Sequence, residues 1–404
     1  MFSLFSELLQ VALGRRDALS RVPTGEEWRW LQEEAKRQAV VGILFSGIER
    51  LPLEQRPDED LFYGWWVDVN RLEERNAKMD KRCLALLRKM EEGGLRATIL
   101  KGQGVAKLYG PLRARRQCGD IDLFVDGGFE RVMHRVPKDK LGEWGYKHVD
   151  LRVWRDTEVE LHYRVEYISD PVRNRRLQQW FAAHNEELFH RDGEWVTPTL
   201  EMNLFYILLH IYRHFIWQGV GLRQIIDYYF CLKRHNENCA IKPPPPHGDS
   251  PFCKGENFRT QDPAQSRAQG AMPSAGRLSP LDKGEYPKGE GVHNSQFSLF
   301  NSPFTIPSGL NRFARGLMWV MGEVLAMPRE WMPWPPDEKE GRFILEQVQA
   351  GGNFGTHQYH SSHSMNRTLR HSLHLFRHYP AEVFATPLWA IYNRLWKLRH
   401  SRQS

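Results

Sequence analysis

The chain has 404 residues, of which 41% are hydrophobic, and its formal net charge is +7. The length allows two or three domains and the composition supports a large buried core, which excludes a chain too polar to fold. The positive charge favours anionic partners such as nucleotides, nucleic acid or a phosphorylated substrate, although a soluble protein with a mildly basic surface has the same balance.

The cysteines and the hydrophobic runs favour a cytoplasmic protein. The five cysteines form no Cys-x-x-Cys pair and have no zinc-ligand spacing. Such an odd, scattered set suits a reducing compartment better than a disulfide framework. The first residues, MFSLFSELLQVALGRRD, include Glu7 and lack a basic start, which favours an amphipathic helix over a signal peptide. No window approaches 18 uninterrupted apolar residues, so a transmembrane segment is not expected.

Residues 1–94 are predicted to form an N-terminal helical region. Apolar residues recur at helical spacing in residues 27–51 and again in residues 61–94. The pair Gly93-Gly94 is expected to end the last helix, because glycine commonly follows the last helical turn.

In residues 95–170 the spacing of apolar side chains changes, and this region is predicted to form an α/β core with a mixed sheet. Residues 95–102, LRATILKG, are expected to form a short buried strand, residues 104–110 a helical turn, and residues 120–126, DIDLFVD, a second strand.

The rest of this core is predicted to contain one helix and a pair of strands. Residues 127–146 are expected to form a helix that closes at Gly145. Residues 146–156 and 157–165 alternate apolar and polar side chains, which favours an antiparallel pair that turns at residues 155–157.

Helical spacing returns in residues 171–239 and in the C-terminal region, residues 306–404. Between them, residues 240–305 are rich in Pro, Gly, Ser and charge, so they cannot bury enough apolar area to offset their chain entropy and are predicted to be a disordered insertion. The last helix, residues 381–400, is amphipathic and basic. We expect it to dock on the protein with a solvated basic face; contact with a membrane or nucleic acid is the alternative.

Asp120 and Asp122 open the second predicted strand. Because residues i and i+2 of a strand point to the same face, the two carboxylates project together while Ile121 packs on the other face. Two nearby carboxylates repel, and a raised pKa or a bound cation relieves the repulsion. Mg²⁺ is commonly held by one or two carboxylates together with substrate phosphates. The alternative is that both acids face solvent and cap the turn after Gly119.

Two further features accompany this pair of acids. Glu160 lies centrally in a later alternating strand and is the best third carboxylate for a two-metal site; His162 shares its face. Before the acids, Lys-Gly-Gln-Gly at residues 101–104 forms a strand-to-helix turn, where backbone N–H groups can hold phosphate. Arg116 and two preceding arginines offer forked donors for phosphate.

The chain resembles the nucleotidyltransferase family of bacterial proteins with a polymerase-β-type catalytic fold. In that superfamily a glycine-bearing turn precedes an acid–apolar–acid strand, and a third acid lies on a later strand. The similarity covers roughly residues 95–235, with a looser match at residues 351–355. It implies an α+β fold in which a small mixed sheet, like a polymerase-β palm, is flanked by N- and C-terminal helical regions. The motifs that carry it are LKG at 100–102, YGPLRARRQCGDIDLFV at 109–125, WGY at 144–146 and VELHYRV at 159–165.

The resemblance implies a catalytic role for the three acids. Asp120 and Asp122 would bind the two metal ions, Mg²⁺ or Mn²⁺, with Glu160 as a further ligand or as the base for the acceptor hydroxyl. The turn at Gly102 would hold the β- and γ-phosphates of an NTP.

Lys101, Gln103 and Arg116 complete the expected nucleotide-binding set. Lys101 either reaches phosphate or is an ordinary surface lysine, and Arg116 either steadies the triphosphate or pairs with one of the two aspartates. The superfamily usually has Gly-Ser or Gly-Gly at the turn, whereas Gln103 follows Gly102 here. The serine hydroxyl is therefore missing, which leaves room for a weakened or altered activity.

Four residues are expected on the acceptor side: His162, His210, Arg213 and Arg223. His162 either orients the acceptor or water, or is satisfied by a neighbouring acid. His210 and His214 share one helix face, as the histidines of an HExxH zinc site do, but the run HIYRH lacks the glutamate. This favours packing, or the lining of a substrate pocket together with Arg213 and Arg223.

The predicted function is a cytoplasmic, Mg²⁺-dependent nucleotidyltransferase that moves an NMP from an NTP substrate to an acceptor and releases pyrophosphate. The sequence selects neither the acceptor (a small molecule, a sugar, a protein or RNA) nor the oligomeric state. Two alternatives stay open. One is a non-catalytic nucleotide-binding or regulatory protein on the same fold; the other is a basic helical protein that binds nucleic acid in a salt-dependent way.

Overall fold

The computed structural model describes residues 1–241, 308–353 and 375–401. Across these residues no helix is both long enough and apolar enough to cross a bilayer. The predicted insertion at residues 240–305 falls outside the described residues, except that the helix preceding it runs to Ile241.

The N-terminal region is helical, as predicted. A capping box between Thr24 and Glu27 starts its second helix, and the Asp58 side chain accepts the Leu61 N–H at the start of the long fourth helix. That helix ends before Gly94, whose φ of +69° favours glycine. The elements are α1 (Phe2–Ala12), α2 (Gly25–Arg37), α3 (Val41–Arg50), a 3₁₀ turn (Leu53–Gln55) and α4 (Glu59–Glu92).

A five-stranded mixed sheet lies against α4 and has the order β1-β2-β5-β4-β3. Strands β2 and β5 are parallel, and all other neighbours are antiparallel. The predicted α+β fold class is therefore confirmed, as is the antiparallel pairing of the last two strands. The strands are β1 (Ala97–Leu100), β2 (Ile121–Val125), β3 (Leu141–Trp144), β4 (His148–Leu151) and β5 (Val159–His162).

The helix predicted for residues 127–146 is wrong over its second half. Helix α6 (Gly128–Arg135) ends early, a 3₁₀ turn (Lys138–Lys140) follows, and strand β3 occupies the remainder. Pro137 is the physical reason, because proline lacks the N–H that the helix needs and disfavours helical geometry in the residue before it. The chain then pairs with β4 at the outer edge of the sheet.

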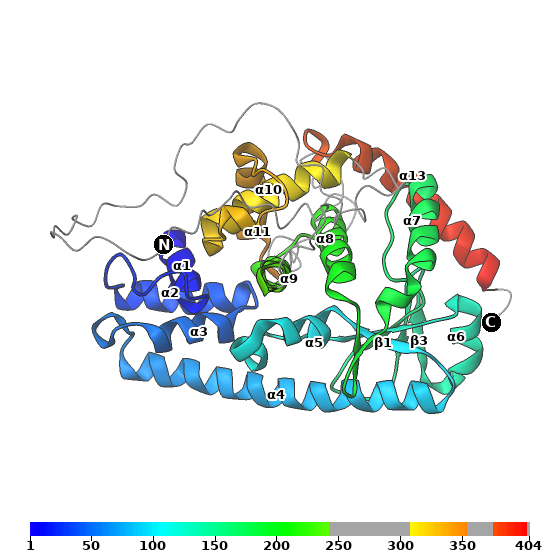
Figure 1. The fold of residues 1–404 in the computed structure, drawn as a ribbon, viewed down its shortest axis with the longest axis horizontal. Helices are drawn as coiled ribbons and strands as arrows, with labels where there is room; N and C mark the ends of the chain where they lie inside the picture. Colours follow the sequence, from blue (N-terminus) through cyan, green and yellow to red (C-terminus); the bar gives the residue numbers. More distant parts are fainter. Residues whose placement is uncertain (242–307, 354–374, 402–404) are drawn as a thin grey trace, which may run out of the picture.

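The remaining elements are mostly helical, and most of their helices lie toward the opposite side of the molecule from α4 (Figure 1). Helix α8 is buried on all sides, which explains why its sequence is apolar around the whole helix. The elements are α5 (Lys101–Ala106), a 3₁₀ segment (Lys107–Arg115), α7 (Pro171–Ala183), a 3₁₀ turn (Asn185–Leu188), β6 (His190–Asp192), β7 (Trp195–Thr197), α8 (Leu200–Trp217), α9 (Leu222–Ile241), α10 (Ser308–Leu325), a 3₁₀ turn (Arg329–Trp331), α11 (Glu338–Gly351) and α13 (Pro380–His400).

Two hydrophobic cores hold the described parts together. The larger core joins α1–α3 to α8, α9, α10 and α11, and the smaller lies between the sheet, α4, α6 and α13. Helix α13 docks through Trp389 and Trp396, which are buried against aromatic side chains of the sheet region. Its outer side is not purely basic as expected, because Leu388, Ile391 and Leu395 are also exposed there.

Candidate functional site

The turn between β1 and α5 brings the backbone to the acids. Lys101 and Gly102 both have positive φ, +44° and +33°, and a Cβ on Gly102 would lie 3.6 Å from the Asp120 carbonyl oxygen. At Gly104 a Cβ would approach the Ile99 carbonyl oxygen to 2.6 Å, so only glycine permits this close packing. The turn is thus built to run beside Asp120, as the sequence suggested.

The three predicted acids converge. Asp122 on β2 is the register partner of Glu160 on the parallel strand β5, and Asp120 immediately precedes β2. Carboxylate oxygens of all three lie within 4.8 Å of one another. The strand register therefore produces the cluster of acids that the i, i+2 pattern could only suggest.

The pKa values of the three acids are shifted in different directions. The neighbouring Asp122 and then burial raise the pKa of Asp120. Burial also opposes ionisation of Asp122, but the Lys101 ammonium and the hydrogen bond from His162 outweigh it and lower the pKa of Asp122. Hydrogen bonds from His148 and His162 likewise outweigh burial and lower the pKa of Glu160.

Lys101 and His162 both contact Asp122. The Lys101 ammonium lies 2.5 Å from Asp122 Oδ1, and His162 Nε2 lies 2.8 Å from the same oxygen and 3.0 Å from Glu160 Oε2. Of the two roles considered for His162, satisfaction by a neighbouring acid is the one that this geometry displays. Lys101 is neither an ordinary surface residue nor distant from the acids.

The oxygen-rich cluster fits a hard divalent cation. Carboxylates are suitable ligands for Mg²⁺ or Mn²⁺. The pKa of Asp120 is raised because the repulsion from the Asp122 carboxylate is only partly offset by the Lys101 ammonium. Among the described residues a second group can also supply three metal ligands: His148, Glu160 and His162. Its two imidazoles make it a softer donor set, more typical of transition metals.

Arg116 is buried and pairs with an acid other than the two expected. Its guanidinium makes two hydrogen bonds to Asp227 on α9, each 2.7 Å, and Tyr109 donates to the same carboxylate at 2.6 Å. Burial opposes the charge of Arg116, but Asp227 outweighs it and raises the pKa of Arg116. The pair joins the segment before β2 to α9 and lies on the wall of the pocket that contains the acids.

Gln103 is not brought to the acids. Its buried side chain donates to the Asn76 carbonyl oxygen and to the Asp80 carboxylate, both on α4. The two other arginines proposed as phosphate donors also turn to helices: Arg113 pairs with Asp80, and Arg115 pairs with Glu49 and Glu73.

A cavity of about 450 Å³ lies between the sheet and helices α8 and α9. The sheet side carries the acids, and the helix side carries His210, Arg213 and Arg223, three of the four residues expected on the acceptor side. The fourth, His162, contacts the acids and does not line the cavity. The polar lining consists of Lys101, Arg116, Asp120, Asp122, Lys147, His148, Glu160, Tyr167, His210, Arg213, His214, Gln218, Arg223, Gln224, Asp227 and Asn393.

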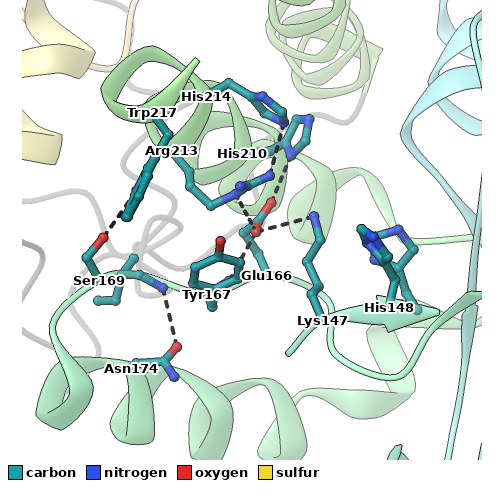
Figure 2. Close-up of polar contacts among 12 residues, drawn as sticks. Lys147, His148, Glu166, Tyr167, Ser169, Asn174, His210, Arg213, His214 and Trp217 are labelled. Carbon is teal, nitrogen blue, oxygen red and sulfur yellow. Dashed lines mark hydrogen bonds and ion pairs between the residues drawn. The ribbon is translucent and has the colours of Figure 1, made fainter. Parts of the chain in front are cut away.

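Glu166 was missed from the sequence, yet it organises one end of this cavity (Figure 2). It is fully buried. Its carboxylate oxygens lie 2.8 Å from His210 Nδ1, 2.8 Å from Arg213 Nε and 3.5 Å from Lys147 Nζ. Burial opposes its charge, but Arg213 and Lys147 outweigh burial and hold the pKa of Glu166 well below its usual value.

The same cluster sets the charge of its other members. Burial lowers the pKa of His210 to about 3, so this imidazole is neutral at pH 7 and donates from Nδ1 to Glu166. Burial also lowers the pKa of Lys147 to about 8 in spite of Glu166. Lys147 falls inside the strand expected for residues 146–156, but nothing local in the sequence indicates that it points into a cavity.

A family model described as an uncharacterised nucleotidyltransferase matches residues 24–240, more than half of the chain. The chain belongs to this nucleotidyltransferase family. No curated protein and no solved structure matches the chain. The nucleotidyltransferase match begins at the cap of α2, spans the whole five-stranded sheet and ends in α9, so it includes all of the cavity-lining residues except Asn393.

Proposed function

We propose that this nucleotidyltransferase uses a divalent metal to move an NMP from an NTP to an acceptor, with release of pyrophosphate. The observation that carries the proposal is the convergence of Asp120, Asp122 and Glu160 at the end of a cavity, beside a glycine turn. Membership of the family supports the reaction class.

Asp120, Asp122 and Glu160 would hold Mg²⁺ or Mn²⁺. The bound metal would neutralise the triphosphate and activate the acceptor hydroxyl. Among the residues of the chain itself, Glu160 would receive the proton of that hydroxyl, since its carboxylate lines the cavity. Helix α8 and Arg223 would form the opposite wall, where the acceptor enters.

The turn at Gly102 would supply phosphate binding through its backbone. Its positive φ is typical of turns that expose successive N–H groups to an anion. Because the Gln103 side chain is held by α4, only the main chain at this position can contribute. The Lys101 ammonium pairs with the Asp122 carboxylate. It would contact a phosphate oxygen in its place when a triphosphate is bound.

The first prediction concerns the acids. Asp120→Asn and Asp122→Asn should each reduce NMP transfer by at least about 100-fold, because each removes a charged metal ligand. The measurement is transfer of label from each labelled NTP, with Mg²⁺ or Mn²⁺ and a cell extract as the acceptor source, together with pyrophosphate release.

Asp139→Asn is the matched control, since Asp139 is an exposed acid that does not line the cavity. It should keep wild-type transfer. Full activity in purified, folded Asp122→Asn would refute the metal assignment.

A second candidate is a nucleotide sensor that binds without turnover. Two observations favour it: the Lys101 ammonium already supplies a positive charge to Asp122, and Gln103 stands where the superfamily usually has serine or glycine. Calorimetry with Mg-NTP beside the pyrophosphate assay separates the candidates, because a sensor binds the nucleotide and releases no pyrophosphate.

A further inference from the structure

The cavity has a basic end as well as an acidic one. Lys147, in the turn between β3 and β4, and Arg213, on α8, approach the same carboxylate from two sides (Figure 2). Both side chains are buried, with 6% and 11% of their surface exposed, and both line the cavity that contains the acids. We call Lys147 and Arg213 the basic pair.

Glu166 holds the basic pair in place but does not balance its charge. One carboxylate faces the Lys147 ammonium and the Arg213 guanidinium, and the third partner, His210, is neutral at pH 7. The group therefore carries one excess positive charge in a buried setting. An uncompensated charge costs far more there than at a surface, so the site favours an additional anion.

Glu166 already has other partners. Its Oε1 accepts the Tyr167 N–H at 3.1 Å and lies 2.8 Å from Arg213 Nε, and its Oε2 accepts from His210 at 2.8 Å. The Lys147 ammonium stands 3.5 Å away, longer than a normal charge-assisted hydrogen bond. Lys147 thus has N–H donors to offer to a ligand in the cavity.

The acids at the other end supply negative charge to the cavity that Lys147 and Arg213 also line. A cation bound by the acids would cancel that contribution. Binding of an anion by the basic pair would therefore be most favourable when the acids hold a metal ion.

We propose that Lys147 and Arg213 form an anion-binding subsite, built on Glu166, for a phosphate or carboxylate group of the substrate. The proposal rests on the proposed transferase function and narrows it: the cavity takes a substrate with an anionic group beyond the one that the glycine turn holds. That group belongs either to an anionic acceptor or to the nucleotide.

Calorimetric titration of the full chain with inorganic phosphate, without metal or nucleotide, tests the subsite. Wild type should bind phosphate saturably, and Lys147→Gln should weaken binding about 10-fold or more, because a hydrogen bond to a charged group is lost. Lys147→Arg, which keeps the charge, should restore most of the affinity.

Lys140→Gln is the control, since Lys140 is a half-exposed lysine outside the cavity and should leave phosphate binding unchanged. Arg213→Lys is a second test variant that keeps the charge but loses the forked geometry, and it should also weaken binding. Circular dichroism and thermal unfolding establish that each variant is folded.

Repeating the titration with Mg²⁺ and a non-hydrolysable NTP analogue bound identifies the source of the anion. Phosphate that still binds assigns the subsite to the acceptor, and phosphate displaced by the analogue assigns it to the nucleotide. Wild type without saturable binding, or Lys147→Gln with wild-type affinity, would overturn the proposal. Because metal-free phosphate binding requires no transfer, the subsite and the transferase function can each fail alone.

Discussion

At the scale of single residues, Glu166 is a buried charge whose removal should be strongly destabilising. Glu166→Gln should lower the free energy of unfolding by about 3–5 kcal/mol at pH 7, because two buried cations lose their counter-charge. Chemical denaturation followed by circular dichroism measures this difference. Glu194→Gln, at an exposed glutamate, should change stability by less than about 0.5 kcal/mol.

The pH dependence of that difference tests whether charge is the cause. The folded pKa of Glu166 is lowered, so its stabilising contribution is complete above the ordinary value of 4.5 and is lost as the pH falls toward the folded pKa. The gap between wild type and Glu166→Gln should be constant from pH 7 to about 5 and narrow below that. A gap that stayed constant down to pH 3 would indicate that packing, and not charge, is responsible.

The sequence located some of these residues and not others for a geometric reason. Strand alternation put Asp120 and Asp122 on one face and placed Glu160 centrally in a later strand, and the structure brings them together. Glu166 and Lys147 lie outside the strand ends, where no period fixes the direction of a side chain. The helix partners of Glu166 lie more than 40 residues away in the chain, so only the tertiary fold could reveal them.

At the scale of elements, α13 depends on its two buried tryptophans. Trp396 packs edge-on against Phe129 at 5.1 Å and against Tyr146 at 5.2 Å, and Arg164 lies over its ring. Trp396→Ala should therefore lower the free energy of unfolding by about 3–5 kcal/mol, through lost contacts and a cavity. The measurement is urea denaturation monitored by circular dichroism.

The neighbouring Leu395 provides the comparison, because 61% of its surface is exposed. Leu395→Ala should change stability by less than about 0.5 kcal/mol. Equal effects of the two substitutions would mean that α13 is not docked through Trp396.

Element types were more predictable than element ends. Helical spacing predicted a helical N-terminal region, and the Gly93-Gly94 pair predicted the end of its last helix, where Gly93 is the C-cap of α4. The predicted helix at 127–146 failed because Pro137 ends the helix and the residues after it pair as β3. A four-residue edge strand has too few alternating positions to compete with a helical pattern.

At the scale of the whole molecule, the family match and the folded unit do not coincide. The match ends at residue 240, yet α10 packs on α1 and α8, and Gln10 donates to the Glu323 carbonyl oxygen at 3.2 Å. Helix α13 closes the smaller core and contributes Asn393 to the cavity wall. We therefore infer that the C-terminal helices are part of the same folding unit as the matched region.

This inference predicts that a chain truncated after Ile241 will not fold stably. Truncation would uncover core faces such as Phe215, which packs on Phe313 at 5.0 Å, and large exposed apolar faces lead to aggregation or dye-binding partly folded states. Deletion of residues 250–300 alone should leave the unfolding midpoint unchanged, because that segment is predicted to add no core. Size-exclusion chromatography, dye binding and thermal unfolding distinguish the two variants. A soluble, cooperatively unfolding chain of residues 1–241 would show that the matched region folds alone and that α10, α11 and α13 are additions to it.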